Sequence, residues 1–292
     1  MKFSAEVTHF VDWGMSNCEE AKGRAASCEG CPSQKACMSN KPTEDPDTEK
    51  ILQNLSNIKH ILLVLSGKGG VGKSTLSTQL AFLMSQTKQV GLLDLDICGP
   101  SIAKLTNSES ETIHQGLQIQ PICLTDTLIS MSPAYFTKQA LIWRSEKKNG
   151  LIKTMLRDVD YGELDFLVVD MPPGTSDEHL SIVSLLKKRK LHCIVVTTPS
   201  DLSLLDVGKE ISFIEKVGIV NLGLVQNMTK FKCTNCMKEK AIFGEHSGNY
   251  LAEIDIDPLL CRYSDEGKFV DCDRPAFQQL EQLASKILSF FE

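Results

Sequence analysis

The sequence predicts an α/β protein with a doubly wound, mainly parallel sheet and a cysteine-rich N-terminal extension. Two observations predict the sheet. A glycine-rich phosphate-binding loop at residues 66–75 directly follows the apolar run 60–65 and opens a helical stretch. Beyond it, short apolar runs alternate with helical segments, which is the order of βαβ units. In such sheets ligands bind at the carboxyl ends of the strands, so functional side chains should gather at that edge.

The expected elements follow from apolar runs and from helical periodicity. Strands are predicted at residues 61–65, 90–95, 128–132, 166–170, 193–197 and 222–226. Helices are predicted at residues 73–85, 138–156, 178–188, 205–216 and 275–290. We predict three parts: an N-terminal cysteine-rich iron-sulfur segment at 1–40, a linker at 41–55 and a P-loop ATPase domain at 56–292. The linker prediction rests on two prolines and four charged residues within 41–47, which cannot pack a core.

Composition excludes several classes of protein. The chain of 292 residues can bury a large core, and its net charge of -6 argues against a dedicated nucleic-acid binder. The basic run at 187–190 is expected to be a solvated helix end. No stretch of 18 apolar residues occurs, and the N-terminus lacks the build of a signal peptide. We therefore expect a cytoplasmic protein that binds neither nucleic acid nor membrane.

The phosphate-binding loop fits the pattern G-x-x-x-x-G-K-[ST] through Gly67, Gly72, Lys73 and Ser74. Lys73 is expected to contact the β and γ phosphates, and Ser74 the Mg²⁺ ion. A second lysine, Lys68, lies inside the loop, and two cations so close are costly unless they share a highly charged anion. The expected nucleotide-binding residues of the loop are Gly67, Lys68, Gly69, Gly70, Val71, Gly72, Lys73, Ser74 and Thr75.

Carboxylates follow two of the predicted strands. Asp94 and Asp96 end the second strand, where alternate spacing would put both acids on one side. One acid could then serve the magnesium shell while the other positions the attacking water. Asp170 closes the fourth apolar run as a Walker B aspartate, and the stiff turn at 172–174 is a plausible sensor of the γ phosphate. The expected catalytic residues are Lys68, Lys73, Asp96 and Asp170.

Eleven cysteines are many for a protein in a reducing compartment, where disulfides are rare. They fall into two groups and a scattered remainder. The first group is Cys18, Cys28, Cys31 and Cys37, and the second is the C-x-x-C pair Cys233 and Cys236. The remaining cysteines are expected to be small buried hydrophobes: Cys98, Cys123, Cys193, Cys261 and Cys272.

These motifs carry a family resemblance that covers nearly the whole chain. Lys68 with Lys73, together with the segments 94–101 and 170–175, resembles the deviant Walker A ATPases, which include septum-site and partition ATPases and the nitrogenase iron protein. More narrowly, the chain is similar to the Mrp branch, in which an Asn-Met pair contacts adenine and leads into C-x-x-C, as at 226–236. The N-terminal cysteines resemble those of the nucleotide-binding protein 35 type of cytosolic iron-sulfur cluster assembly scaffold.

The resemblance implies a weak ATPase that assembles [4Fe-4S] clusters and transfers them to cytosolic and nuclear apo-proteins. It implies a homodimer, or a hetero-oligomer with a shorter paralogue, in which Lys68 reaches the partner's nucleotide. Asp96 matches the switch I acid, and Asn227 matches the adenine contact. ATP and Mg²⁺ are the implied cofactors, and apo iron-sulfur proteins and downstream targeting factors are the implied further partners. The implied location is the cytoplasm, with the nucleus as a second site.

The resemblance also assigns both cysteine groups. Cys233 and Cys236 would hold a bridging, transferable [4Fe-4S] cluster with the same pair of the partner subunit, because two thiolates cannot close a four-iron site. A redox dithiol and half of a zinc site are the alternatives for this pair.

The N-terminal set would hold one further [4Fe-4S] cluster per chain, although four thiolates suit zinc equally well by geometry. Its pattern is C-x9-C-x2-C-x5-C. The first gap is shorter than in the family, which keeps Cys28, Cys31 and Cys37 in register and makes Cys18 the ligand that the resemblance supports least.

Two other functional classes share the loop. A partition or septum-positioning ATPase would use a basic surface or a basic amphipathic C-terminal helix, whereas residues 277–291 contain a single lysine and no arginine. Their apolar face is therefore expected to pack on the sheet. A redox ATPase that donates electrons, with zinc or an iron-sulfur cluster as a structural site, would hold its cluster by separated single cysteines, unlike the adjacent Cys233 and Cys236.

Overall fold

The computed structural model describes residues 45–114, 116–136, 145–175, 177–233, 235–244, 246, 248–269 and 275–292. The chain divides into two compact units, Met1–Pro46 and Asp47–Glu292, and the account that follows concerns the second. Five cysteines lie outside the described residues: Cys18, Cys28, Cys31, Cys37 and Cys272. The predicted N-terminal metal site therefore stays a prediction.

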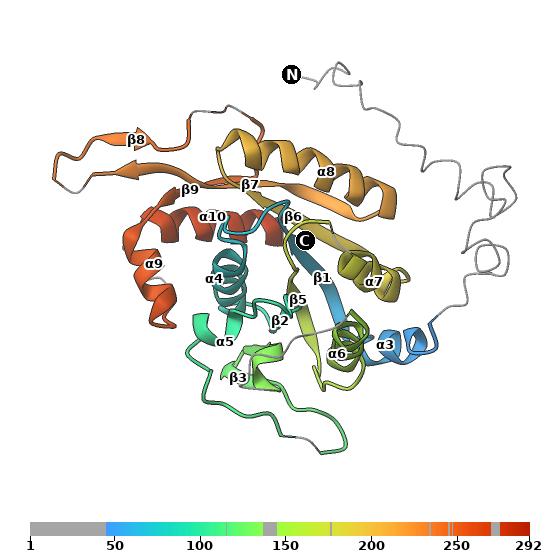
Figure 1. Cartoon of the computed structure of the whole chain (residues 1–292). Coiled ribbons are helices and arrows are strands. Elements are labelled where there is room, and N and C mark those ends of the chain that lie inside the picture. The colour runs from blue at the N-terminus through green and yellow to red at the C-terminus, as the bar shows by residue number, and fades with distance from the viewer. Residues whose placement is uncertain are drawn as a thin grey trace, which may run out of the picture. The chain divides into compact units, whose positions relative to one another are not determined.

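The centre of the unit is a mixed, mostly parallel sheet (Figure 1). Within the described residues its strands are β1 Ile58–Leu65, β2 Val90–Asp94, β3 Ile122–Thr125, β4 Leu128–Met131, β5 Leu164–Asp170, β6 Leu191–Thr197, β7 Val220–Lys232, β8 Glu239–Ala241 and β9 Ala252–Ile256. Their order is β3-β4-β2-β5-β1-β6-β7-β8, and β9 pairs with β7. Only the pairs β3–β4 and β7–β8 are antiparallel. The predicted fold class and the six predicted strands are confirmed, whereas β3, β8 and β9 were not predicted.

Helices cover both faces of the sheet. They are α3 Thr48–Asn54, α4 Lys73–Ser85, α5 Ile102–Leu105, α6 Ser145–Arg157, α7 Asp177–Leu186, α8 Asp201–Val217, α9 Pro258–Asp265 and α10 Pro275–Ser289, with a 3-10 turn at Pro133–Tyr135. The first of the five predicted helices, at residues 73–85, has the same bounds as α4. The predicted helix 138–156 is confirmed from Ser145 onward, and its earlier residues lie outside the described part.

The central strand β1 shows how the two layers form. Ile61, Leu63 and Leu65 pack in one hydrophobic cluster with α3, α6, α7 and α8, whereas Leu62 and Val64 pack in the other with α4 and α10. Because successive side chains of a strand point to opposite faces, a strand covered by helices on both faces must be apolar throughout. This explains the continuous apolar run before the phosphate-binding loop.

Helix α3 corrects the predicted linker at 41–55. Its residue Ile51 and the following Leu55 are buried in the cluster beneath α6 and α7. Asp47, just before the helix, lies 2.8 Å from Arg157 and 3.6 Å from Lys153 of α6. The i,i+4 spacing of Ile51 and Leu55 gives this largely polar segment a buried stripe.

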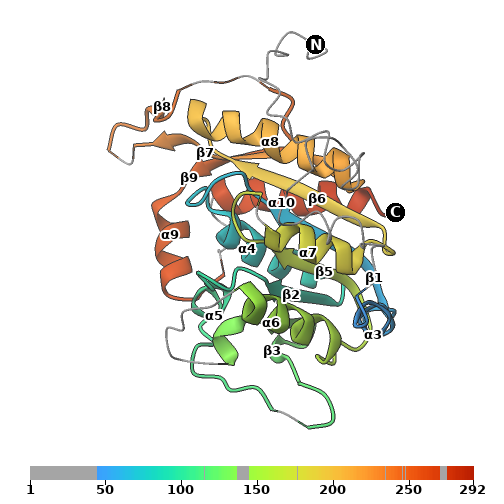
Figure 2. The same ribbon diagram turned by 45° about the vertical axis from the view of Figure 1, so that its right-hand side comes forward.

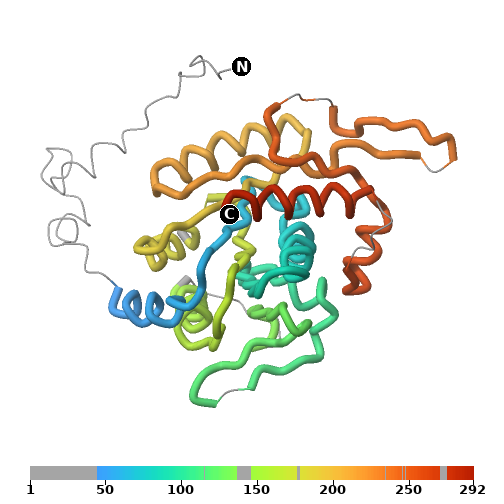
Figure 3. Tube along the Cα trace, turned by 180° about the vertical axis from the view of Figure 1, so that it is seen from behind, coloured from blue at the N-terminus to red at the C-terminus, as the bar shows by residue number. Residues whose placement is uncertain are grey.

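The C-terminal helix α10 packs against α4 and β9, as Figure 3 shows from behind. Ala276, Phe277, Leu280, Leu283, Ala284 and Ile287 are buried there. The expected packing of this apolar face is confirmed. Within the described residues, no helix is long and apolar enough to cross a membrane.

A buried acid in α8 yields a prediction about stability. Glu210 is 0% exposed, neither carboxylate oxygen has a hydrogen-bond partner within the described residues, and burial raises its pKa to about 7. The folded state therefore keeps a proton that the unfolded chain loses at lower pH. As pH rises from about 4.5 to 7, this residue should lower the free energy of unfolding by about 3 kcal/mol.

We expect Glu210→Gln to remove this loss, so that the variant gains stability over wild type at pH 8 and gains little at pH 4.5. Urea unfolding at both pH values measures the difference. Glu215→Gln, on the exposed face of the same helix, is the matched control. An equal gain at both pH values would contradict the prediction.

Candidate functional site

The phosphate-binding loop lies between β1 and α4, as predicted. Gly72 precedes the first residue of α4 with a φ of 86° and contacts Asn227: a Cβ built on Gly72 would lie 2.3 Å from Asn227 Nδ2. At the other end of the loop, a Cβ on Gly67 would lie 2.9 Å from the backbone of Asp206 in α8. At both positions a close neighbour leaves no room for a side chain, so glycine is required. The backbone N–H groups of the first turn of α4 are available for an anion.

Lys73 and Asp170 form a buried ion pair in this site. Lys73 Nζ lies 2.7 Å from Asp170 Oδ1, and the two side chains are 6% and 0% exposed. The hydroxyls of Ser74 and Ser77 donate to the same carboxylate at 2.6 and 2.8 Å. The parallel pairing of Val64 with Asp170 brings the Walker B acid beside the loop that follows β1.

The two acids of the second strand have different environments. Asp94 is fully buried and accepts hydrogen bonds from the backbone N–H groups of Asp96 and Ser101 and from the Ser132 hydroxyl. Burial, and then the nearby charge of Asp170, raises the pKa of Asp94 to about 8. Its place among these donors makes Asp94 the anchor of the 96–101 turn.

Asp96 is half-buried, and its carboxylate accepts from the backbone N–H of Gly99 at 3.2 Å. Burial raises the pKa of Asp96 and the charge of Lys73 lowers it, which places this acid near the loop lysine. Because β2 ends at Asp94, strand alternation does not relate the two acids; the turn orients Asp96.

The turn after Asp170 is tied to β1. The Gly174 backbone N–H donates to the Ser66 carbonyl at 2.7 Å, and the Met171 N–H donates to the Val64 carbonyl at 3.2 Å. A shift of this turn would therefore move the backbone at the start of the phosphate-binding loop.

Lys68 and Asn227 are the remaining predicted nucleotide contacts. Lys68 is exposed, together with Gly69 and Gly70, and it makes no ion pair within the described residues. Asn227 is buried, and its Nδ2 donates to the Val71 carbonyl at 2.8 Å. Asn227 thus lies against the loop, and its contact with adenine stays a prediction.

Cys233 and Cys236 lie in the connection between β7 and β8, a hairpin that extends beyond the sheet in Figures 1 and 2. The Cys233 N–H donates to the Lys238 carbonyl at 3.0 Å, and the Met237 N–H donates to the Cys233 carbonyl at 2.8 Å. Backbone N–H groups of Cys236 and Asn235 donate to the Cys233 sulfur and lower its pKa. Such donors stabilise a thiolate, which is the form that binds metals.

The thiol pair supplies only part of a metal site. Within the described residues, no group of three or more His, Cys, Asp or Glu side chains could hold a metal ion. Iron-sulfur clusters and structural zinc sites take four ligands, so the remaining ligands would have to come from outside this part of the chain.

The scattered cysteines correct another expectation. Cys193 in β6 is buried, but Cys98, Cys123 and Cys261 are exposed. Cys98 lies on the turn after β2, and Cys123 lies on the outer strand β3, whose burial alternates. A composition argument cannot distinguish these positions from core positions.

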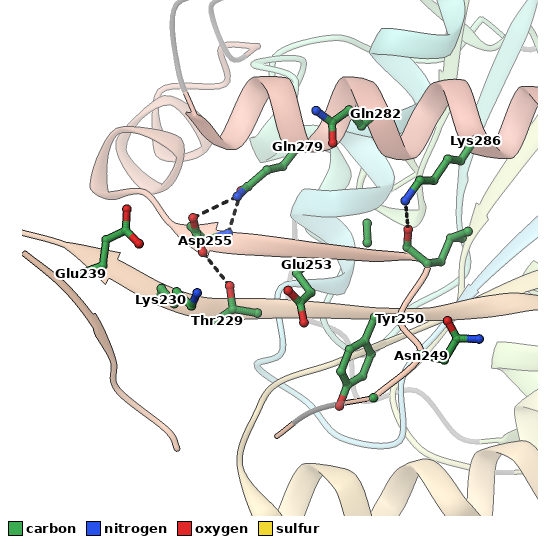
Figure 4. A pocket seen from close by; sticks show the side chains of 13 residues that line it. Thr229, Lys230, Glu239, Asn249, Tyr250, Glu253, Asp255, Gln279, Gln282 and Lys286 are labelled. Carbon is green, nitrogen blue, oxygen red and sulfur yellow. Dashed lines mark hydrogen bonds between the residues drawn. The ribbon is translucent and has the colours of Figure 1, made fainter. Parts of the chain in front are cut away.

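Sequence reasoning missed a polar cavity of about 500 Å³ between the base of the hairpin, β9 and α10 (Figure 4). There Asp255 accepts from the Thr229 hydroxyl at 2.7 Å and from Gln279 Nε2 at 2.9 Å. Lys286 Nζ donates to the Leu251 carbonyl at 2.7 Å. These bonds hold β9 and the residue before it to β7 and α10. No sequence motif indicates them, because the residues come from three separate segments.

Comparison with known proteins identifies the family. The profile of the ParA group described as "NUBPL iron-transfer P-loop NTPase" matches residues 57–288. The chain belongs to this family. The expected resemblance is confirmed by a relative named cytosolic Fe-S cluster assembly factor NBP35, from Kluyveromyces lactis, which is 45% identical over 271 residues; the match covers 86% of this chain and 83% of the relative.

Solved structures of P-loop NTPases share the fold. A nucleotide-binding protein from Archaeoglobus fulgidus, solved with ADP, has 33% identity and a TM-score of 0.67; the match covers 80% of this chain and 96% of that one. The cell division ATPase MinD of Pyrococcus furiosus has 20% identity and a TM-score of 0.57, over 80% of this chain and 100% of that one, and shows the fold alone.

The geometry of the loop yields a second prediction. We expect Gly72→Ala to lower the free energy of unfolding by about 1–3 kcal/mol, because the new methyl group meets Asn227 and the residue must keep a positive φ. Gly69→Ala is the matched control, since no atom lies within 4 Å of its Cβ position. Urea unfolding without nucleotide measures both variants, and equal stability would show that the Gly72 contact is not a constraint.

Proposed function

We propose that this protein is an ATP-dependent scaffold that assembles [4Fe-4S] clusters on Cys233 and Cys236 and transfers them to apo-proteins of the cytosol and nucleus. The observation that carries the proposal is the thiol pair itself: two ligands, one of them stabilised as a thiolate by backbone N–H groups, at the exposed end of a hairpin. The family membership and the name of the Kluyveromyces lactis relative support it.

The residues of the loop fit ATP with Mg²⁺. A phosphate bound by the loop N–H groups would compete with Asp170 for the Lys73 ammonium, and Ser74 and Asp170 are oxygen ligands of the kind that Mg²⁺ accepts. The metal would neutralise charge on the phosphates. Asp96 is half-buried near Lys73, where it can orient the attacking water.

A half-site requires a second contributor. The proposal therefore includes a homodimer, or a hetero-oligomer with a shorter paralogue, in which each chain brings one thiol pair and Lys68 reaches the partner's nucleotide. Lys68 and Cys236 are exposed and Cys233 is half-buried, which is compatible with this arrangement. Cys18, Cys28, Cys31 and Cys37 would hold a second cluster, and apo iron-sulfur proteins and targeting factors would be the further partners.

The nucleotide part of the proposal is tested with Lys73→Ala. We expect ATP hydrolysis to fall by at least about 100-fold, because the lysine is the cation that would meet the γ phosphate. The substitution also leaves Asp170 buried without its ion pair, so the melting temperature must be measured beside the rate. Exposed Lys187→Ala is the control for the loss of a lysine. Hydrolysis at the wild-type rate in a folded Lys73→Ala protein would refute the assignment.

The thiol part is tested by iron, acid-labile sulfide and zinc per chain after anaerobic reconstitution. We expect about six irons in wild type and about four in Cys233→Ala/Cys236→Ala, because the shared cluster would contribute half its iron to each chain. Cys123→Ala/Cys261→Ala, which removes two other exposed thiols, should retain about six. Zinc without sulfide would leave an ATPase with structural metal sites and exclude the scaffold.

A further inference from the structure

Lys148 of α6 joins two segments that border the nucleotide site. Its Nζ lies 2.7 Å from Cys98 Sγ and 2.8 Å from Glu178 Oε1. The side chains of Lys148 and Glu178 are only 16% and 19% exposed. Figure 2 shows α6 and α7 side by side. The ion pair of Lys148 with Glu178 joins these two helices.

The two partners of Lys148 belong to the segments that would sense the γ phosphate. Cys98 lies two residues after Asp96, in the turn that Asp94 anchors. Glu178 lies in the first turn of α7, a helix that begins shortly after the 172–174 turn. One ammonium group therefore contacts the segment that carries the water-orienting acid and the helix that follows the Walker B acid.

Charge explains why a cation is needed there. The carboxylate of Glu178 acts on Asp96 as a like charge, so the two acids lie near one another. Like charges repel more strongly in a partly buried site than in water, because the effective dielectric constant is lower. Lys148 supplies the opposite charge beside Glu178, and its bond to Cys98 draws the Asp96 turn toward α7.

We propose that Lys148 is a positioning residue for ATP hydrolysis, which holds the Asp96 turn against α7 so that the acid and the Walker B segment keep one geometry. The inference rests on the ATPase activity proposed above. Lys148 acts through Cys98 and Glu178, so removing it should lower kcat and leave ATP affinity nearly unchanged.

The kinetic test compares Lys148→Met, which keeps the length and removes the charge, with Lys148→Arg and with the control Lys147→Met. Lys147 is the exposed neighbour of Lys148 on α6. We expect Lys148→Met to lower kcat about tenfold with KM within about twofold, because small misplacements of reacting groups are costly. Lys148→Arg should recover kcat to within about threefold, since it keeps the charge and the donors. Wild-type kcat in Lys148→Met, or no recovery with arginine, would overturn the proposal.

A double-mutant cycle tests the ion pair itself. Glu178→Gln combined with Lys148→Met should be no slower than Lys148→Met alone, because both changes break the same link. Multiplied effects of the two substitutions on kcat would show that Lys148 and Glu178 act independently, which would overturn the link.

Hydrogen exchange gives a readout that does not depend on catalysis. Without nucleotide, the amides of Ile97, Cys98, Gly99 and Ser101 should exchange about tenfold faster in Lys148→Met and at the wild-type rate in Lys147→Met. Unchanged exchange in Lys148→Met would refute the positioning role even if hydrolysis were slow. Conversely, wild type that fails to hydrolyse ATP while Lys148→Met shows the faster exchange would refute the proposed ATPase and leave the link intact.

Discussion

The buried ion pair between Lys73 and Asp170 is the constraint on which the rest of the site depends. Removing two charges from water costs several kcal/mol per ion, and their attraction offsets this cost only with good geometry and further hydrogen bonds. The hydroxyls of Ser74 and Ser77 supply those bonds. Such a pair contributes little net stability, so its value lies in keeping both groups ready for a phosphate and a metal. The ion pair requires β1 and β5 to be neighbours, so it depends on the crossover connections that set the strand order of the sheet.

Asp94 shows how the site limits the negative charge beside this pair. It is fully buried near Asp170, and burial together with the Asp170 charge raises the pKa of Asp94, which favours its protonated form. The acid can therefore anchor the 96–101 turn without adding a full charge next to the Walker B carboxylate. The turn is thus held by hydrogen bonds at Asp94 on one side and by Lys148 on the other.

Most of the fold and of the nucleotide site could be predicted from local patterns. The predictions that failed did so for physical reasons. The strand β5 and the helix α4 are visible because a buried parallel strand is a continuous apolar run and the P-loop fixes the start of its helix. Helix α3 was missed because the segment is largely polar, and its buried residues Ile51 and Leu55 form a stripe only where α6 and α7 cover them. Strands β3, β8 and β9 were missed because they are only three to five residues long, and their identity comes from pairing.

The roles of the site residues could likewise be predicted only in part. Lys73 and Asp170 were predictable because phosphate chemistry requires a lysine at the start of the helix after one strand and an acid at the end of a neighbouring strand. The contact of Asn227 with the loop was not, since it joins residues 156 positions apart through one hydrogen bond. The role of Lys148 was missed for the same reason. Lys148 lies 50 positions after Cys98, and no local pattern indicates that its ammonium group contacts that turn.

The hydrogen bond of Asn227 also joins the phosphate-binding loop to β7, the strand that leads to Cys233. Asn227 touches the loop through Val71 and Gly72, and the same strand continues to Lys232, one residue before Cys233. Cys233 follows Asn227 by six positions, and β7 is irregular between them, because Met228 has a φ of 60° and the pairing with β9 shifts register before Phe231. Antiparallel pairing with β8 stiffens the far half of this segment. If the Val71 carbonyl moved, it would have to break its bond with Asn227 or carry the asparagine with it, so a change at the loop would reach β7 six positions before Cys233.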